Sequence, residues 1–515
     1  MKIESVNKSF KRAAICTLRH RWLVLAAFAA LMVFSVVGTK RIVMKTSFDD
    51  YFLEDDPVLV KTNEFKSIFG NDYYAAVLVK NKDVFSHRSL SLIRELSNEL
   101  LDSLSYAEKI TSLTDLEFTV GNDEGLAIEQ IVPDEIPTNA DSLAAIRQRA
   151  FSKPHLARKL VSKDGTMTWI MVKLRTFPPE QEWKKTSNTS PDILTGKELA
   201  HIISKPKYRE LSPNASGMPY LTHEKVTFLQ GEMGRLMLFA FIASILIMFF
   251  VTRSLRGVVA PLLTSVVGIL LGYGVIGWAG IYVDQPTVMI AVILAFACSI
   301  AYNIHLYNFF KTRFVQTGRR RTSVVEAVGS TGWGVLLSGL TTIAAMATFL
   351  AMKIVPMQAI GLNTSLCLLG VLGTCLFITP VLLSFGRNRK PHPHMNRSIE
   401  GRAGTLFERL GNFVIRRHRA VVIVSVVFTA FCAVGLFSIE PAFDVERTMG
   451  RKVPYVARFL DLCQTELGSM YSYDVMIVLP KAGDAKLPSN LEKLDKLSRI
   501  AQTYKLTKRH NSILD

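Results

Sequence analysis

The chain has 515 residues, of which 49% are hydrophobic and 20% are charged. This mixture excludes an ordinary soluble domain, because the apolar residues gather in runs of about 20, long enough to cross a hydrocarbon layer of roughly 30 Å. The formal net charge of +18 would suit a nucleic-acid-binding protein. The Lys and Arg residues cluster at the ends of the apolar runs, however, as they do in membrane proteins, so we expect no nucleic-acid partner.

The first apolar run, Trp22–Gly38, follows a basic leader and resembles a signal peptide. No small-x-small cleavage site follows it before charge resumes, so we expect an uncleaved anchor. Residues 1–40 are therefore predicted to be a cytoplasmic leader and a first transmembrane helix.

Residues 41–235 have the character of a soluble domain. The apolar run Tyr73–Val79 and the segment Met167–Leu174 are strand-like, and Leu90–Leu104 has the leucine spacing of a helix. Alternation of this kind predicts an α+β sandwich of the ferredoxin-like kind. The stretch Glu117–Lys163, with Pro133, Pro137 and many charges, is predicted to be an insertion.

Five further apolar runs fill residues 236–385, and a seventh occupies residues 420–438. We expect these six membrane spans at Leu236–Thr252, Val258–Val283, Thr287–Phe310, Gly332–Met352, Met357–Phe385 and Ala420–Phe437. The fold class predicted from the sequence is thus an α-helical polytopic membrane protein of about seven transmembrane helices, with α+β domains of the porter type outside the membrane.

The connectors set the expected orientation. Lys and Arg are frequent in the leader, in the second-to-third and fourth-to-fifth loops, and in the connector 386–419, whereas the short loops on the other side almost lack them. Because positive loops favour the cytoplasm, we expect a cytoplasmic N-terminus and connector in the cell (inner) membrane. Residues 41–235 and 439–515 then lie on the extracytoplasmic side.

The sequence after the seventh span repeats the landmarks that follow the first. A Phe-Asp pair, an amphipathic stretch, the strand-like run Tyr471–Leu479 and a helix-like segment Asn490–Gln502 appear in the same order. We interpret the chain as two parallel halves, the second truncated within its outer domain, with Tyr73–Val79 and Tyr471–Leu479 as equivalent central strands. A second chain could supply the missing half.

This arrangement of one span, an outer domain, five spans and a repeat resembles the RND superfamily, and within it the MMPL-like exporters. The motifs that carry the resemblance are Leu53–Pro57, Thr111–Asp115, Ser299–Leu306 in the fourth span and Leu336–Ala345 in the fifth. The resemblance implies proton-driven export of hydrophobic or lipid-like substrates, with membrane lipids as partners. The family's fourth span commonly carries a buried Asp that relays protons, and Ala301 occupies that position here.

Ionisable residues inside a bilayer are costly and are candidates for function. Spans two to six contain almost none, which leaves His305, Asn303, Thr341 and Thr342 as candidates for a proton or substrate pathway. His305 shares a helix face with Ala301 and is either a proton relay or an interfacial residue. The other three either bind substrate or ions or join helices by hydrogen bonds.

The glycines of spans three and six are predicted to be sites of close helix packing: Gly268, Gly272, Gly274, Gly370 and Gly373. Pro261 and Pro380 lie near span ends, where the membrane helix can accommodate them.

No catalytic triad, paired-carboxylate frame, nucleotide-binding loop or metal-ligand spacing occurs in a confirming context, and the six cysteines form no such pattern. We therefore expect neither an enzyme nor a bound metal or cofactor. The function predicted is an ion-driven transporter; the alternatives are a membrane sensor or scaffold with a bundle like that of sterol-sensing proteins, a protein-translocation accessory subunit, which the repeat argues against, and a non-functional fragment.

Overall fold

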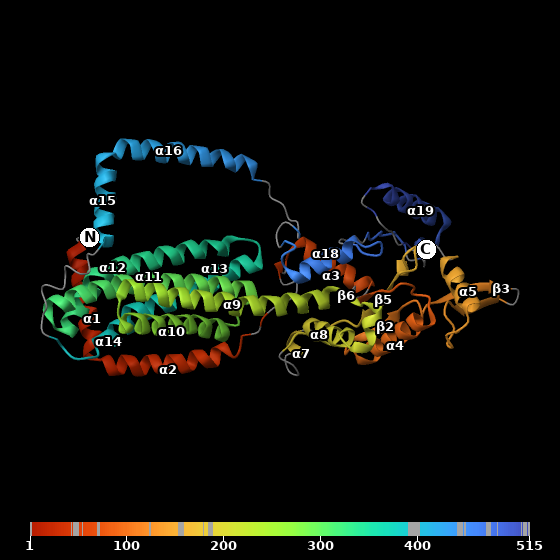
Figure 1. The fold of residues 1–515 in the computed structure, drawn as a ribbon, viewed down its shortest axis with the longest axis horizontal. Helices are drawn as coiled ribbons and strands as arrows, with labels where there is room; N and C mark the ends of the chain where they lie inside the picture. Colours follow the sequence, from red (N-terminus) through yellow and green to blue (C-terminus); the bar gives the residue numbers. More distant parts are fainter. Residues whose placement is uncertain are drawn as a thin grey trace. The chain divides into compact units, whose positions relative to one another are not determined.

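The computed structural model of the chain is shown in Figure 1. It describes residues 3–42, 44, 51–53, 55–69, 73–122, 125–152, 159–178, 180–183, 189–389, 402–439, 446, 450–469, 475–481, 483–505, 507 and 512. The chain divides into two compact units, one formed by Met1–Leu53 with Leu229–Ala442 and the other by Glu54–Phe228 with Phe443–Asp515.

The described residues include seven helical segments long and apolar enough to cross a membrane, as the sequence predicts. They are α2 (Arg21–Thr39), α9 (Met218–Thr252), α10 (Leu255–Ala279), α11 (Gln285–Thr317), α12 (Arg320–Ala347) with η3 (Thr348–Ala351), α13 (Val355–Gly373) with η4 (Thr374–Ile378) and α14 (Thr379–Ser384), and α16 (His418–Val434) with η6 (Gly435–Ser438). Of these, α10 to α13 pack side by side in one bundle (Figure 1).

Two more helices in this unit have strongly amphipathic sequences. They are α1 (Ile3–Arg19), which is the basic leader, and α15 (Arg402–Arg416), which lies in the basic connector. Along α12, which α1 contacts, Gly329 and Gly332 lie against the side chains of Lys11 and Phe10. The leader is therefore an ordered helix on the bundle.

The bundle depends on close backbone contacts made by α10. A Cβ atom placed on Gly272 would lie 2.6 Å from the Cα of Cys367 in α13, and one on Gly268 would lie equally close to the Cα of Val371. On the α2 side, Gly274 faces Ser35 at similarly short range. These glycines allow two helices to pack against α10 with their backbones almost touching, which is the usual role of small residues in membrane helices.

The packing prediction holds for Gly370, whose added Cβ would meet the carbonyl oxygen of Gly268, but it is wrong for Gly373. No atom lies within 4 Å of a Cβ built on Gly373, because this residue is on the side of α13 that faces away from α10. Regular spacing of glycines does not show which of them lies on the contact face.

The second unit is built on a four-stranded sheet of order β2-β5-β1-β6 in which all neighbours are antiparallel. Its strands are β1 (Tyr74–Lys80), β2 (Ala107–Thr111), β5 (Met167–Leu174) and β6 (Asn214–Ser216). Helix α4 (His87–Ser103) joins β1 to β2, and α8 (Pro191–Ile203) lies between β5 and β6. The elements β1, β5 and α4 coincide with the predicted strands and helix, and they supply much of the unit's buried apolar core.

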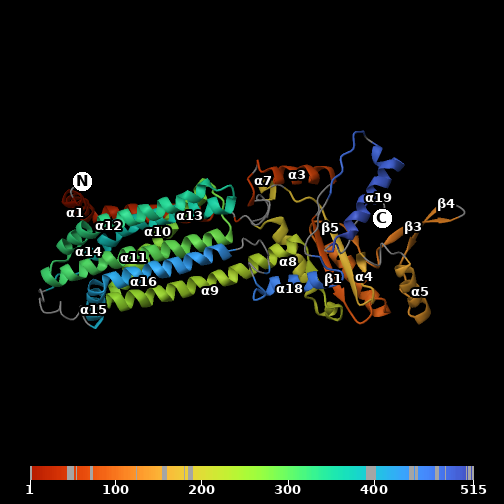
Figure 2. The same cartoon turned by 90° about the horizontal axis from the view of Figure 1, so that it is seen from above.

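The predicted insertion holds a separate hairpin of β3 (Glu117–Asn122) and β4 (Gly125–Gln130), followed by α5 (Ala140–Phe151) (Figure 2). The remaining elements are α3 (Pro57–Phe69), α7 (Glu180–Trp183), η2 (Pro206–Leu211), α18 (Pro454–Gln464), η7 (Asp484–Lys486) and α19 (Pro488–Thr503). The acidic run before α3 has a local structural role, because Asp56 accepts a hydrogen bond from the Val58 backbone N–H at 2.8 Å and Pro57 begins the helix.

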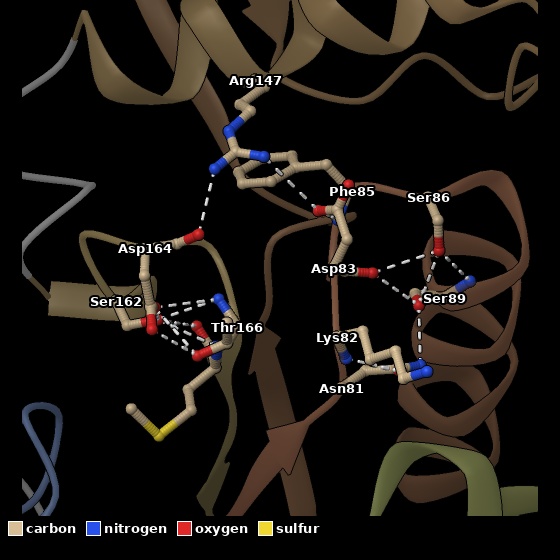
Figure 3. A network of polar contacts seen from close by, with 11 residues as sticks. Asn81, Lys82, Asp83, Phe85, Ser86, Ser89, Arg147, Ser162, Asp164 and Thr166 are labelled. Carbon is tan, nitrogen blue, oxygen red and sulfur yellow. Dashed lines mark hydrogen bonds and ion pairs between the residues drawn. The ribbon is translucent and has the colours of Figure 1, made fainter.

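A polar network fastens α5 to the sheet (Figure 3). The Arg147 guanidinium donates to the Asp164 carbonyl oxygen at 3.0 Å, lies 3.8 Å from the Asp83 carboxylate, and stacks over Phe85. Hydrogen bonds from Ser162 and Thr166 lower the pKa of Asp164 and close the turn before β5. The insertion is therefore joined through Arg147 to the loops that follow β1 and precede β5.

The segment after the seventh span packs on the same sheet as the first outer segment. Arg458 in α18 donates to the carboxylate of Glu224 and to the Ala215 carbonyl oxygen on β6, and the Trp169 indole N–H donates to the Leu467 carbonyl oxygen at 3.0 Å. Leu462 and Leu467 belong to the apolar core of the unit. Helix α19 coincides with the predicted helix Asn490–Gln502.

The expected second central strand is not observed. Residues 475–479 have no strand conformation, and Val475 and Val478 are exposed. A strand needs a neighbour to satisfy its backbone hydrogen bonds, and no described residue pairs with this run. Tyr471–Asp474 and the Phe-Asp landmarks at 48–49 and 443–444 lie outside the described residues.

Close packing at α10 leads to a test with two alanine substitutions. In Gly272→Ala the new methyl group would meet the α13 backbone, so we expect a loss of about 1–3 kcal/mol in stability. In Gly373→Ala the methyl group enters open space, and the higher helix propensity of alanine should leave stability unchanged or raise it by up to about 1 kcal/mol. Thermal unfolding of the purified variants in one detergent checks this, and equal unfolding midpoints would contradict it.

Candidate functional site

The residues of α11 that were singled out from the sequence lie on two different sides of this helix. Ala301 and His305 are exposed on the surface of the bundle, and Asn303 is fully buried inside it. Ala301 and His305 therefore do share a helix face, as four-residue spacing predicts. Among the described residues, no hydrogen bond joins His305 to Asn303, Thr341 or Thr342.

Asn303 is the centre of a buried hydrogen-bond network between α10, α11 and α14. Its Nδ2 donates to the Ser299 carbonyl oxygen at 2.9 Å, and its Oδ1 accepts from the Thr379 hydroxyl at 2.7 Å. The Ser299 hydroxyl lies 2.6 Å from that of Ser265, which donates to the Pro261 carbonyl oxygen at 2.7 Å. The network thus runs through three helices with no water-exposed member.

A π-helical turn in the sixth span, η4, aims two threonines at this network. In an α-helix, residues five apart lie about 140° apart around the axis, whereas a π turn brings them to the same side. Thr374 donates to the Thr264 carbonyl oxygen at 2.9 Å, and Thr379 reaches both Asn303 and, at 3.1 Å, the Thr264 hydroxyl. The turn lies directly before Pro380, which cannot donate a backbone hydrogen bond.

Thr341 and Thr342 in α12 do not join the network. Both hydroxyls donate to the Ser338 carbonyl oxygen of their own helix, at 2.9 and 2.8 Å. Back-bonding of this kind satisfies a hydroxyl in an apolar environment. In this structure the two threonines therefore make local contacts, on the surface side of the bundle.

The buried network contains only amide and hydroxyl groups. None of them gains or loses a proton near neutral pH, so the network can hold helices in register or bind a polar group, but it cannot carry protons as a carboxylate would. Among the described residues, no group of three or more His, Cys, Asp and Glu side chains is arranged to hold a metal ion.

Sequence reasoning found Asn303 but missed most of its partners: Thr264, Ser265, Ser299, Thr374 and Thr379. For all of them but Thr374, the common signal is a hydroxyl residue within one turn of a proline or at a four-residue interval from Asn303. That signal is weak, because Ser and Thr are ordinary in membrane helices and their direction depends on a π turn that the sequence does not predict.

A comparison with known protein families shows to which family the chain belongs. The model of the MMPL family matches residues 75–439. This range contains the four-stranded sheet and every candidate span after the first. The chain belongs to the MMPL family. It is a multi-pass membrane protein, consistent with a membrane transporter, and members of this family are transporters rather than enzymes.

Relatives of this MMPL protein are also described as membrane proteins. The membrane protein MJ1562 of Methanocaldococcus jannaschii is 22% identical over 393 residues, which are 74% of this chain and 94% of MJ1562. SCO6666 of Streptomyces coelicolor is 28% identical over 53% of this chain and 37% of its own length. YdfJ of Bacillus subtilis is 24% identical over 35% of this chain and 25% of its own length.

The Asn303 network predicts a stability difference between two asparagines of one helix. Asn303→Ala removes the acceptor of Thr379 and leaves buried hydroxyls unsatisfied, so we expect a loss of about 1–2 kcal/mol. Asn308→Ala, an exposed position with no side-chain hydrogen bond in the structure, should change stability by less than about 0.5 kcal/mol. Thermal unfolding in detergent measures both, and an Asn303 variant as stable as the Asn308 variant would disprove the role of the network.

Proposed function

We propose that this MMPL protein is a secondary transporter that moves hydrophobic or lipid-like substrates across or out of the cytoplasmic membrane, using an ion gradient. The observation that carries the proposal is the family match over a chain that combines a helix bundle with a folded non-membrane unit.

The orientation belongs to the same proposal. The basic residues of the bundle lie at the helix ends formed by the α9–α10 connection, the α11–α12 connection and the segment after α14. The positive-inside rule then places this end in the cytoplasm and the unit built on the four-stranded sheet outside.

For that outer unit we propose a ferredoxin-like fold of the porter type. Its support is the connectivity β1-α4-β2 followed by β5-α8-β6, with the strand order β2-β5-β1-β6. A βαβ unit repeated in this way, with antiparallel neighbours, is the pattern of that fold.

Proton coupling, if the ion is a proton, is assigned to the exposed face of α11. The buried network has no titratable group, and Ala301 cannot titrate, whereas the imidazole of His305 lies on the same exposed face. A polar group on a lipid-facing helix surface is unfavourable, so the proposal includes a second helix bundle, supplied by another chain, that covers this face.

A vesicle assay tests both the transport and its coupling. Purified protein in liposomes should move a fluorescent phospholipid analogue between leaflets when a proton gradient is imposed, and an uncoupler should abolish the movement. In His305→Gln we expect the pH dependence of transport to be lost, because glutamine keeps a hydrogen-bonding group but cannot carry a proton.

The matched control is Asn308→Gln, one turn further along the same exposed face, which should leave the pH dependence intact. If the unaltered protein moves the lipid at the same rate with and without the proton gradient, ion coupling is contradicted. An unchanged pH profile in His305→Gln would remove His305 as the relay and leave the transport proposal standing.

A further inference from the structure

We propose that the basic end of the bundle contains a binding site for a phosphate group, supplied by the headgroup of an anionic phospholipid. The site is formed by three arginines from different segments: Arg256 at the start of α10, Arg320 at the start of α12, and Arg389 after α14. The ends of α11, α12 and α14 meet at this part of the bundle (Figure 1).

Arg320 is a buried charge whose contacts in the protein are incomplete. The residue is 9% exposed, its Nη1 donates to the Leu383 carbonyl oxygen at 3.0 Å, and its Nε has no hydrogen-bond partner. The guanidinium lies 4.7 Å from the ring centre of Phe314 and 5.6 Å from that of Phe310. A buried guanidinium with an unsatisfied N–H is costly, and an anion would offset that cost.

The charges of the other two arginines, Arg256 and Arg389, act on the Arg320 guanidinium. A Cβ atom on Gly386 would lie 2.7 Å from Arg256 Nη1 and 3.2 Å from Arg320 Nε, so both guanidinium groups border the same glycine. Asn388 accepts a hydrogen bond from the Arg320 backbone N–H at 3.0 Å, and the Arg389 N–H donates to the Gly318 carbonyl oxygen at 3.1 Å. The segment that carries Arg389 is thereby tied to the start of α12.

The described residues offer these arginines no carboxylate partner. The ion pair found at this end of the bundle joins Arg313 to Glu326, at 3.3 Å, and no Asp or Glu in the described part of the chain pairs with Arg256, Arg320 or Arg389. Three like charges side by side repel one another, and a negatively charged phosphate group with several acceptor oxygens relieves this repulsion.

The helix termini add to the positive potential. Both α10 and α12 begin at this end, and their N-cap residues, Ser254 and Arg319, make no side-chain capping bond. The N-terminus of a helix carries a partial positive charge and free N–H groups that favour phosphate. These helix termini contribute only partial charges, whereas the arginines supply the full charges of the site.

The place of the site in the fold favours a lipid over free phosphate. The arginines lie where membrane-spanning helices end, at the depth of phospholipid headgroups. Basic pockets between the ends of transmembrane helices are suited to anionic headgroups. A free phosphate ion would offer the same oxygens, so the two sources must be separated by experiment.

The test is the thermal unfolding of the purified full chain in a mild detergent with added phosphatidylglycerol, phosphatidylcholine or inorganic phosphate. We expect phosphatidylglycerol to raise the unfolding midpoint and phosphatidylcholine to leave it unchanged. In the double variant Arg256→Gln, Arg389→Gln the apparent affinity for phosphatidylglycerol should fall at least tenfold. Both residues are exposed, so the substitutions do not disturb the core.

The matched control is Arg321→Gln, Arg387→Gln, which removes the same net charge from exposed positions next to the site. It should bind phosphatidylglycerol like the unaltered protein. Stabilisation by inorganic phosphate alone, lost in the site variant and kept in the control, would support the anion site and assign it to free phosphate. Equal responses of the two double variants, or no preference for either anion over phosphatidylcholine, would overturn the proposal.

Discussion

Close backbone contact between helices is the constraint on which the rest of this structure depends. Inside a bilayer the helices gain little from burying apolar side chains against each other, since lipid is equally apolar, and they must associate through packing and hydrogen bonds. Gly268 and Gly272 let α13 approach α10 until the two backbones nearly touch. Only at that distance can the short hydroxyl side chain of Thr374, in the sixth span, donate to the Thr264 backbone carbonyl oxygen of α10.

Two sets of polar groups in the bundle have different consequences. The interior set around Asn303 is neutral and mutually satisfied, which makes it a fixed structural element. The charged set at the basic end is unsatisfied at Arg320 Nε. In a medium where unpaired polar groups are expensive, the second set is where a ligand has most to contribute.

The span positions could be predicted from the sequence because hydropathy over about 20 residues follows directly from bilayer thickness. The strands β1 and β5 and the helix α4 could also be predicted from the sequence, since their apolar periodicity matches their secondary structure. The repeat led to the wrong prediction of a strand at Val475–Leu479. Matching sequence landmarks do not show that a neighbouring strand is present to pair with it. The prediction of close packing at Gly373 was wrong for a related reason, because spacing along a helix does not identify the face in contact.

The candidate site was predicted less completely than the fold. Asn303 is conspicuous in an apolar run, but its partner Thr379 directly follows the π turn η4, which the sequence does not predict. Arg320 appeared only as one of many basic loop residues. Its burial against Phe314 and its missing partner are properties of three segments brought together, and no local sequence pattern encodes them.

The central claim is that this MMPL protein spans the membrane with its basic helix ends in the cytoplasm and its sheet-containing unit outside. Cysteine accessibility in intact cells tests it most directly, in a variant without the six native cysteines. Lys80→Cys, at the end of β1, should react with a membrane-impermeant thiol reagent added outside, and Arg321→Cys, at the start of α12, should react only after the membrane is permeabilised. Labelling of Arg321→Cys but not of Lys80→Cys in intact cells would contradict the account.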